Sequence, residues 1–236
     1  MPQQSLVSII IPTLNEQNNI LLLLENLQKP AKVELIVCDG GSSDATLEVC
    51  HDFPVRVISA QRGRGIQMNT GAECAQGEIY LFLHADSLIE SRVIEDIRDA
   101  VSLGDQWGCC TLQFNDSTLL FRVIAFLSNL RAKVFSSCYG DQGIYCERDL
   151  FWENNGFPET VFLEDMEFSR RLRSQKRARI VNGIITTSTR RFREAGIWRS
   201  IYRNQVVKVL YALGVKPERL WQWYRSEKQA TLCERQ

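Results

Sequence analysis

The sequence has no surplus of either charge, because 28 lysine and arginine residues balance 28 aspartate and glutamate residues among 236. A balanced chain has no overall field that attracts polyanions, and we therefore expect no nucleic-acid partner. Long apolar runs are also missing, since no stretch reaches membrane-spanning length without a charge. The first residues, Met1-Pro2-Gln3-Gln4-Ser5, lack the basic segment of a signal peptide. These absences predict a soluble, cytoplasmic protein.

Cysteine pairs with CxxC spacing are missing too, although the chain has eight cysteines. Most of them lie inside apolar runs such as Leu35-Ile36-Val37-Cys38, which is typical of buried, reduced thiols. This pattern favours a reducing compartment over a disulfide or zinc framework. Histidine is scarce as well: beyond His51 and His84 no third imidazole can complete a metal site.

Strand-like and helix-like segments alternate through the first half of the chain. Apolar, β-branched runs predict strands at residues 7–11, 33–38, 55–58 and 79–84. Between and after them, helical patterns cover a stretch ending near Lys29-Pro30, one starting at Ser43-Asp44, one from Arg64 to Gly77, and one from Ser91 to Val101. This alternation predicts an α/β fold with a Rossmann-like, mostly parallel sheet flanked by helices.

The second half of the chain is less regular. We expect strands at residues 108–114 and 142–146, helices at 118–134 and 163–172, and a helical tail over about 196–236. Without repeats, low-complexity tracts or a linker, residues 1–236 are interpreted as a single domain. Its two main parts are residues 1–105 and 106–195, both approximately bounded.

Polar residues follow three of the predicted strands, in the segments Pro12-Thr13-Leu14-Asn15-Glu16, Asp39-Gly40-Gly41-Ser42-Ser43-Asp44 and His84-Ala85-Asp86. In a parallel sheet these exits share one edge, and ligands bind there. At positions i and i+2, His84 and Asp86 would share a face, where an imidazole and a carboxylate could hold a divalent cation against an anionic substrate. Taken alone, this segment is better explained as a strand followed by an ordinary polar turn.

Three polar segments have both a functional and an ordinary interpretation, and a fourth has a functional one. The glycines after Asp39 allow close backbone approach and the helix start offers N–H groups to an anion, but an ordinary strand-to-helix turn has the same residues. Arg62-Gly63-Arg64-Gly65 suits a phosphate or is a solvated loop. Glu164-Asp165 either supplies a general base or contains acidic residues that only stabilise the first turn of a helix. Gly140-Asp141-Gln142-Gly143 can hydrogen-bond a hydroxylated ligand.

Together these segments resemble the inverting family-two glycosyltransferases with the GT-A fold. The resemblance is carried, in chain order, by Ile9-Ile10-Ile11-Pro12-Thr13-Leu14-Asn15-Glu16, the Asp39 to Asp44 segment, Leu83-His84-Ala85-Asp86 and Glu164-Asp165, over roughly the first three quarters of the chain. A narrower likeness points to a small bacterial subgroup associated with arsenosugar or selenium-related gene clusters. It rests on Arg62-Gly63-Arg64-Gly65 with Asn69, Gly71 and Ala72, Gly140-Asp141-Gln142-Gly143 and Glu164-Asp165-Met166-Glu167. The subgroup's label assigns no substrate.

The resemblance implies an inverting transfer from a nucleoside-diphosphate sugar, expected to be a UDP-sugar, to an acceptor hydroxyl, with Asp165 as catalytic base. The first part of the chain would bind the nucleotide sugar through Pro12, Thr13, Leu14, Glu16, Asp39, Gly40, Arg64, Gly65 and Asp86. The second part would shape the sugar or acceptor pocket with Asp141, Gln142 and Glu164. The acceptor is expected to be a small molecule or lipid-linked.

The resemblance also implies Mn²⁺ or Mg²⁺ at the DxD motif, where this chain departs from the pattern. Asp86 stands at the last carboxylate, but His84 replaces the first. Three roles are open for His84. It ligates the cation and shifts the metal preference from magnesium toward manganese, it leaves Asp86 as the only protein ligand, or it acts as a hydrogen-bonding group. Diphosphate oxygens and water would complete the ligand set.

Two alternatives to a glycosyltransferase remain. A nucleotidyltransferase normally carries a glycine-rich basic loop after its first strand, where this chain has the Pro12 to Glu16 segment. A non-catalytic nucleotide or membrane-surface module would use the tail, in which Trp198, Tyr202, Trp221, Trp223 and Tyr224 are interleaved with Arg199, Arg203, Lys208 and Arg225. Such helices either contact the inner face of a membrane or pack on the sheet.

Overall fold

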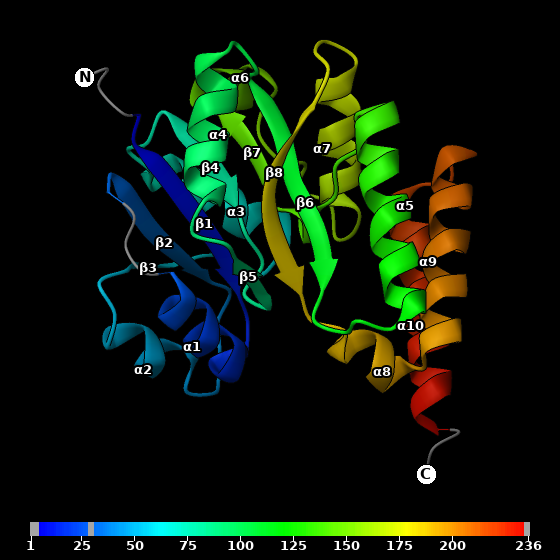
Figure 1. The fold of residues 1–236 in the computed structure, drawn as a ribbon. Coiled ribbons are helices and arrows are strands. Elements are labelled where there is room, and N and C mark those ends of the chain that lie inside the picture. The colour runs from blue at the N-terminus through cyan, green and yellow to red at the C-terminus, as the bar shows by residue number, and fades with distance from the viewer. Residues whose placement is uncertain (1–4, 28–30, 234–236) are drawn as a thin grey trace.

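The computed structural model describes residues 5–27 and 31–233 and shows a mixed α/β fold (Figure 1). Within these residues, eight strands form one sheet in the order β3-β2-β1-β4-β7-β6-β8-β5. The strands are β1 (Val7–Thr13), β2 (Val33–Asp39), β3 (Arg56–Ser59), β4 (Ile79–Phe82), β5 (Ser87–Ile89), β6 (Trp107–Phe114), β7 (Ile144–Glu147) and β8 (Arg179–Thr187). The predicted α/β class and helix-flanked sheet are confirmed.

Helices follow most of the strands. They are α1 (Gln17–Asn26), α2 (Thr46–His51), α3 (Arg64–Cys74), α4 (Val93–Ser102), α5 (Leu119–Phe135), α6 (Arg148–Glu153), α7 (Glu164–Arg173), α8 (Arg190–Ala195), α9 (Ile197–Ala212) and α10 (Pro217–Cys233), with a 3₁₀ turn, η1, at Gly140–Gln142. The predicted helix end near Lys29-Pro30, the residues before Ser5 and the last three residues of the tail lie outside the described residues.

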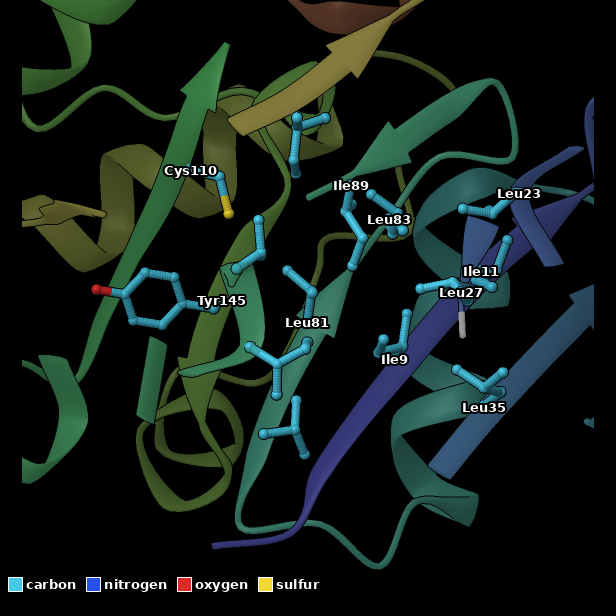
Figure 2. Packing of buried hydrophobic residues seen from close by; sticks show 14 of the residues in the cluster. Ile9, Ile11, Leu23, Leu27, Leu35, Leu81, Leu83, Ile89, Cys110 and Tyr145 are labelled. Carbon is cyan, nitrogen blue, oxygen red and sulfur yellow. The ribbon is translucent and has the colours of Figure 1, made fainter. Parts of the chain in front are cut away.

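The sheet is covered on both faces because side chains alternate along each strand. Ile9 and Ile11 of β1 are fully buried in a cluster with apolar residues of α1, α2 and α4, as Figure 2 shows for the α1 side. Between them, Ile10 points to the other face, where it joins side chains from α3, α5, α6 and α7. The near-continuous apolar strands of the sequence therefore reflect a sheet buried on both sides.

β1, β2 and β4 place their polar exits at one edge of the sheet. β1 is parallel to both β2 and β4, with Thr13 beside Asp39 and Ile10 beside Phe82. The second half differs from the mostly parallel prediction, because β7 pairs antiparallel with β4 and β6, and β5 pairs antiparallel with β8. β4 also ends at Phe82, and a turn closed by the Ser87 N–H and the His84 carbonyl oxygen (3.1 Å) carries Asp86.

β8 is the main element that the sequence analysis did not predict. It pairs parallel with β6 and antiparallel with β5, and so completes the second half of the sheet. Its β-branched residues carry a strand signal, but Asn182 and Gly183 interrupt it. β6 can approach β8 closely because Gly108 has no side chain. A Cβ added at this position would lie 1.7 Å from the carbonyl oxygen of Arg179.

Buried, free cysteines and the lack of a spanning helix agree with the sequence. The seven cysteines whose side chains the structure describes are free thiols, and all but Cys74 are buried. Burial raises the pKa of Cys38 to about 12 and that of Cys50 to about 11, so these thiols stay protonated. Within the described residues, no helix is long and apolar enough to cross a membrane.

The β6–β8 contact generates a stability prediction. Gly108→Ala should lower the free energy of unfolding by about 3 kcal/mol, because the methyl group collides with strand backbone that cannot move aside. Gly104→Ala is the control: it has open space around it but a φ of +94°, and backbone strain alone should cost about 1 kcal/mol. Urea unfolding of both variants measures the difference, and equal losses would contradict the proposed close approach.

Candidate active site

A cavity of about 270 Å³ lies beyond the carboxyl end of β4. It is walled by the turn after β4, η1, the start of α7 and one face of α9. Six residues singled out in the sequence line it together, namely Arg64, His84, Asp86, Asp141, Glu164 and Asp165. They come from segments far apart in the chain, and folding brings them to one place.

His84 and Asp86 both face this cavity from the turn after β4. The imidazole packs against Gly140, where an added Cβ would lie 2.6 Å from His84 Nε2 and 3.4 Å from Asp165 Oδ2. Glycine at position 140 therefore gives the imidazole and the Asp165 carboxylate room to approach the same backbone. The close packing fixes the relative positions of the β4 turn, η1 and α7.

Asp165 is held in place by two backbone N–H groups. The Gly140 amide donates to its Oδ2 at 2.8 Å, and the Met166 amide donates to its Oδ1 at 2.7 Å. The carboxylate lies in the first turn of α7, where the helix dipole favours a negative charge. The carboxylate is therefore anchored at the cavity wall and is partly exposed.

Glu164, the neighbour of Asp165, is buried and paired with Arg64 from the start of α3. The Arg64 Nε lies 3.2 Å from Glu164 Oε1, and the arginine side chain is 42% exposed while the glutamate is 5% exposed. Burial raises the pKa of Glu164, and Arg64 opposes that shift. The ion pair holds the first turn of α3 against α7 and fixes a guanidinium at the cavity wall.

Asp141 is a half-buried residue with one fully buried carboxylate oxygen. Its Oδ1 makes no hydrogen bond within the described part of the chain, and burial raises its pKa. The positive charges of Arg131 and Lys208 oppose this shift, while Asp165 adds to it. Lys208 in turn has its pKa lowered, chiefly by burial. Burial therefore disfavours the charged forms of Asp141 and Lys208, while each favours the charged form of the other.

The C-terminal helices supply a wall that the sequence analysis did not assign to the site. Ser200, Arg203 and Lys208 of α9 line the cavity, together with Tyr224 of α10. Ser200 and Arg203 are buried, and Arg203 donates to the Tyr224 hydroxyl at 3.1 Å. α9 and α10 pack on Leu163, just before α7, in a small core with Val207 and Leu220. The helical spacing of these α9 residues was a usable signal for an inward face.

The other residues assigned to nucleotide binding lie at the same sheet edge but do not line the cavity. They are Pro12, Thr13, Leu14, Glu16, Asp39, Gly40 and Gly65. Asp39 is 3% exposed, and its carboxylate accepts hydrogen bonds from the Gly41 and Ser42 amides at 2.8 and 2.9 Å. It therefore shapes the turn after β2.

Hydrogen bonds join the turn after β1 to the turn after β2. The Asn15 amide donates to Ser42 Oγ at 2.9 Å, and the Ser43 amide donates to Asn15 Oδ1 at 2.8 Å. The Glu16 amide donates to Thr46 Oγ1 at 2.9 Å. These bonds hold the turns after β1 and β2 together as one rigid surface at the sheet edge, which we call the ledge.

Gly65 and Gln142 have packing roles in the structure. A Cβ on Gly65 would lie 2.5 Å from the carbonyl oxygen of Pro158, so a side chain there would push α3 away from the segment before α7. Gln142 is fully buried, and its Oε1 accepts a hydrogen bond from Arg131 at 2.6 Å. Its side chain joins η1 to α5 and does not line the cavity.

The donor set fits a cation that arrives with an anionic substrate. Among the described residues, no group of three or more histidine, cysteine, aspartate or glutamate side chains is placed to hold a metal ion. The cavity offers the Asp86 carboxylate with the His84 imidazole two residues away. Oxygen-preferring cations such as Mg²⁺ commonly take one or two protein carboxylates and complete their shell with phosphate oxygens and water.

Residues 8–116, just under half of the chain, match the family model Glycosyl transferase family 2. The dolichol-phosphate mannosyltransferase of Pyrococcus furiosus is 30% identical over 107 residues, which are 42% of this chain and 30% of that protein. The dolichyl-phosphate beta-glucosyltransferase of Saccharomyces cerevisiae is 26% identical over 118 residues, 42% of this chain and 35% of its own length. The chain thus spans about a third of these curated relatives.

Solved structures show the same fold. Staphylococcus aureus TarS 1–349 in complex with UDP-GlcNAc has a TM-score of 0.61 and 20% identity, covering 78% of this chain and 58% of its own. The mannosyltransferase PcManGT of Pyrobaculum calidifontis, in complex with GDP-Man and Mn²⁺, has a TM-score of 0.66 and 18% identity, covering 99% and 75%. The predicted GT-A-type fold is confirmed. The narrower arsenosugar- or selenium-associated subgroup stays a prediction.

Asp141 generates a pH-dependent stability prediction. Burial raises the pKa of Asp141 in the folded state, so the folded protein holds the carboxyl proton more tightly than the unfolded chain does. The free energy of unfolding therefore falls as the pH rises through the pKa of the folded state. Asp141→Asn removes that loss, so we expect it to raise the free energy of unfolding by about 1–2 kcal/mol above neutral pH. The gain should shrink toward zero at acidic pH, where the wild-type carboxyl is protonated.

Chemical unfolding across this pH range measures the effect, with Asp99→Asn as the control. Asp99 is exposed on α4 and does not line the cavity. If Asp141→Asn destabilised the protein more at high pH than at low pH, Lys208 and Arg131 would outweigh burial, contrary to the assignment.

Proposed function

We propose that this chain is an inverting glycosyltransferase that moves a sugar from a nucleoside-diphosphate sugar to an acceptor hydroxyl, assisted by a divalent cation. The observation that carries the proposal is the meeting of Asp86, Arg64 and Asp165 in one cavity of a GT-A-type fold. The match of residues 8–116 to Glycosyl transferase family 2 and the glycosyltransferase names of the relatives support it.

The nucleotide lies at the sheet edge in this proposal. The ledge of Pro12, Thr13, Leu14 and Glu16 with Asp39 and Gly40 receives the base and ribose, and the start of α3 at Arg64 and Gly65 receives the diphosphate. The fastening of the first two strand exits supports a rigid nucleotide platform. The nucleotide half then extends over about residues 1–105 and the acceptor side over about 106–195 of one domain.

The diphosphate end lies at Asp86. Mn²⁺ or Mg²⁺ held by Asp86, with His84 beside it, supplies electrostatic stabilisation of the leaving group when bound. Arg64, Arg203 and Lys208 face the same cavity and add positive charge where the nucleoside diphosphate departs. UDP-GlcNAc, and GDP-Man with Mn²⁺, in the neighbouring structures support a nucleotide-sugar donor and a metal; we propose a UDP-sugar.

Asp165 is the proposed base. It takes the proton of the acceptor hydroxyl as that oxygen attacks the anomeric carbon and the bond from this carbon to the diphosphate oxygen breaks. Hydrogen bonds from the Gly140 and Met166 amides hold the carboxylate ready for this role. Displacement from the face opposite the leaving group inverts the anomeric centre.

The acceptor enters beside Asp141 and Glu164, with Gln142 supporting the wall. A small molecule or a lipid-linked alcohol fits the proposal, and the phosphate-lipid names of two relatives support the lipid-linked class. The tail contributes in this case through exposed aromatic residues of α9, Trp198 at 74% and Tyr202 at 67% exposure, at the inner face of a membrane.

Asp165→Asn tests the base assignment. The amide keeps the shape and the Gly140 contact but cannot accept a proton, so transfer should fall by about 10²–10⁴-fold. Binding of the nucleoside diphosphate with Mn²⁺ should stay near the wild-type value. Asp149→Asn is a matched control, because Asp149 occupies the first turn of α6 outside the cavity.

Two measurements separate the possible outcomes, namely the rate of sugar transfer and calorimetric binding of UDP with Mn²⁺. Loss of both in a folded Asp165→Asn protein contradicts the base role and leaves the donor site in question. Full transfer activity in that variant contradicts the mechanism itself.

A further inference from the structure

The outer face of α5 is an apolar stripe exposed to solvent. Six residues with helical spacing form it, Leu119, Val123, Phe126, Leu127, Leu130 and Val134, and each is between 44% and 74% exposed. The buried side of the helix is smaller, with Phe121, Ala125 and Ala132. A surface helix of a globular protein normally exposes its polar face to water, whereas α5 exposes most of its large apolar side chains. An exposed apolar patch of this kind marks a docking surface.

A basic cluster borders the C-terminal end of the stripe. Lys133 of α5, Arg173 of α7, and Lys176 and Arg177 just after α7 are all exposed. Val134 and Phe135 line a surface hollow with the last three of these and Arg170, and no acidic side chain lines it. α5 itself carries three basic residues and no acidic residue, although the whole chain has equal numbers of both.

A second hollow continues this surface along the side of α5. Phe126, Leu130 and Lys133 line it together with Arg177 and Arg179. Its one acidic residue, Asp105, is engaged by Arg179, with Asp105 Oδ2 3.7 Å from Arg179 Nε. The apolar stripe therefore runs between hollows whose net charge is positive.

We propose that this α5 surface docks the protein on an anionic lipid bilayer. Apolar side chains enter the boundary between head groups and acyl chains, and the basic cluster contacts the negative head groups. A second copy of the chain fits less well, because in a two-fold contact through the same patch α5 offers no acidic residue to the basic residues of the other copy. The proposal rests on this surface alone and not on the proposed transfer reaction.

The docking surface lies next to the candidate active site. α5 and α9 run side by side in Figure 1, and Arg131 of α5 and Lys208 of α9 both lie over the Tyr139 ring, 3.4 and 5.2 Å from its centre. Tyr139 and Lys208 also line the cavity. Docking through α5 would thus hold the acceptor side of the cavity beside the bilayer, within reach of an amphiphilic acceptor.

Vesicle flotation of the full chain tests the proposal without any nucleotide. We expect binding to vesicles that contain phosphatidylglycerol to exceed binding to pure phosphatidylcholine vesicles by about tenfold or more, and to weaken with salt. The Phe126→Glu/Leu127→Glu double variant should lose at least about tenfold of that binding. Lys176→Gln/Arg177→Gln should weaken it by about fivefold for each charge removed.

The matched control is Leu21→Glu/Leu22→Glu on α1. Leu22 and Leu127 are both 55% exposed, so each variant adds one acid at an equally exposed leucine, and the second acid replaces an exposed apolar residue beside it, Leu21 or Phe126. Circular dichroism and thermal unfolding confirm that each variant is folded. The proposal is overturned if binding ignores lipid charge, if the α5 variant binds like wild type, or if sedimentation shows a dimer that the α5 variant alone dissociates.

Discussion

The hydrogen bond from the Gly140 amide to the Asp165 carboxylate is the contact on which the candidate site depends. It joins η1 to the start of α7, while the His84 imidazole packs on the same glycine from the turn after β4. Because position 140 has no side chain, three distant segments meet over one backbone unit. The contact therefore sets the distance between the residue proposed to hold the cation, Asp86, and the residue proposed to take the proton, Asp165.

Charges of both signs are then confined in the same cavity. Burial raises the pKa values of Glu164 and Asp141 and lowers that of Lys208, so each of these groups resists its charged form. Arg64 opposes the shift at Glu164, and Arg131 joins Lys208 in opposing that at Asp141. An anionic substrate with a cation would change this balance on entry. The site is thus suited to bind a charged ligand, because its own side chains compensate one another incompletely.

Local patterns predicted the sheet edge, while long-range packing determined the rest. The strand ending near His84 and the helix starting at Glu164 were readable from the sequence, because apolar alternation and acidic first turns are local signals. β8 was missed because Gly183 interrupts its β-branched run, although β6 and β5 both pair with it. The inward direction of Lys208 depends on how α9 packs on Leu163. Helical spacing indicates an inward face of α9, but no local signal specifies which segment that face contacts.

The central claim is that Asp86 and Arg64 belong to a nucleoside-diphosphate and metal site, and thermal unfolding of the wild-type protein tests it most directly. The melting temperature should be measured with uridine and guanosine diphosphates and their sugars, with and without Mn²⁺. We predict an increase in Tm that requires nucleotide and metal together and is greatest for a uridine diphosphate ligand. An unchanged Tm with every nucleotide, in the presence of Mn²⁺, would contradict it.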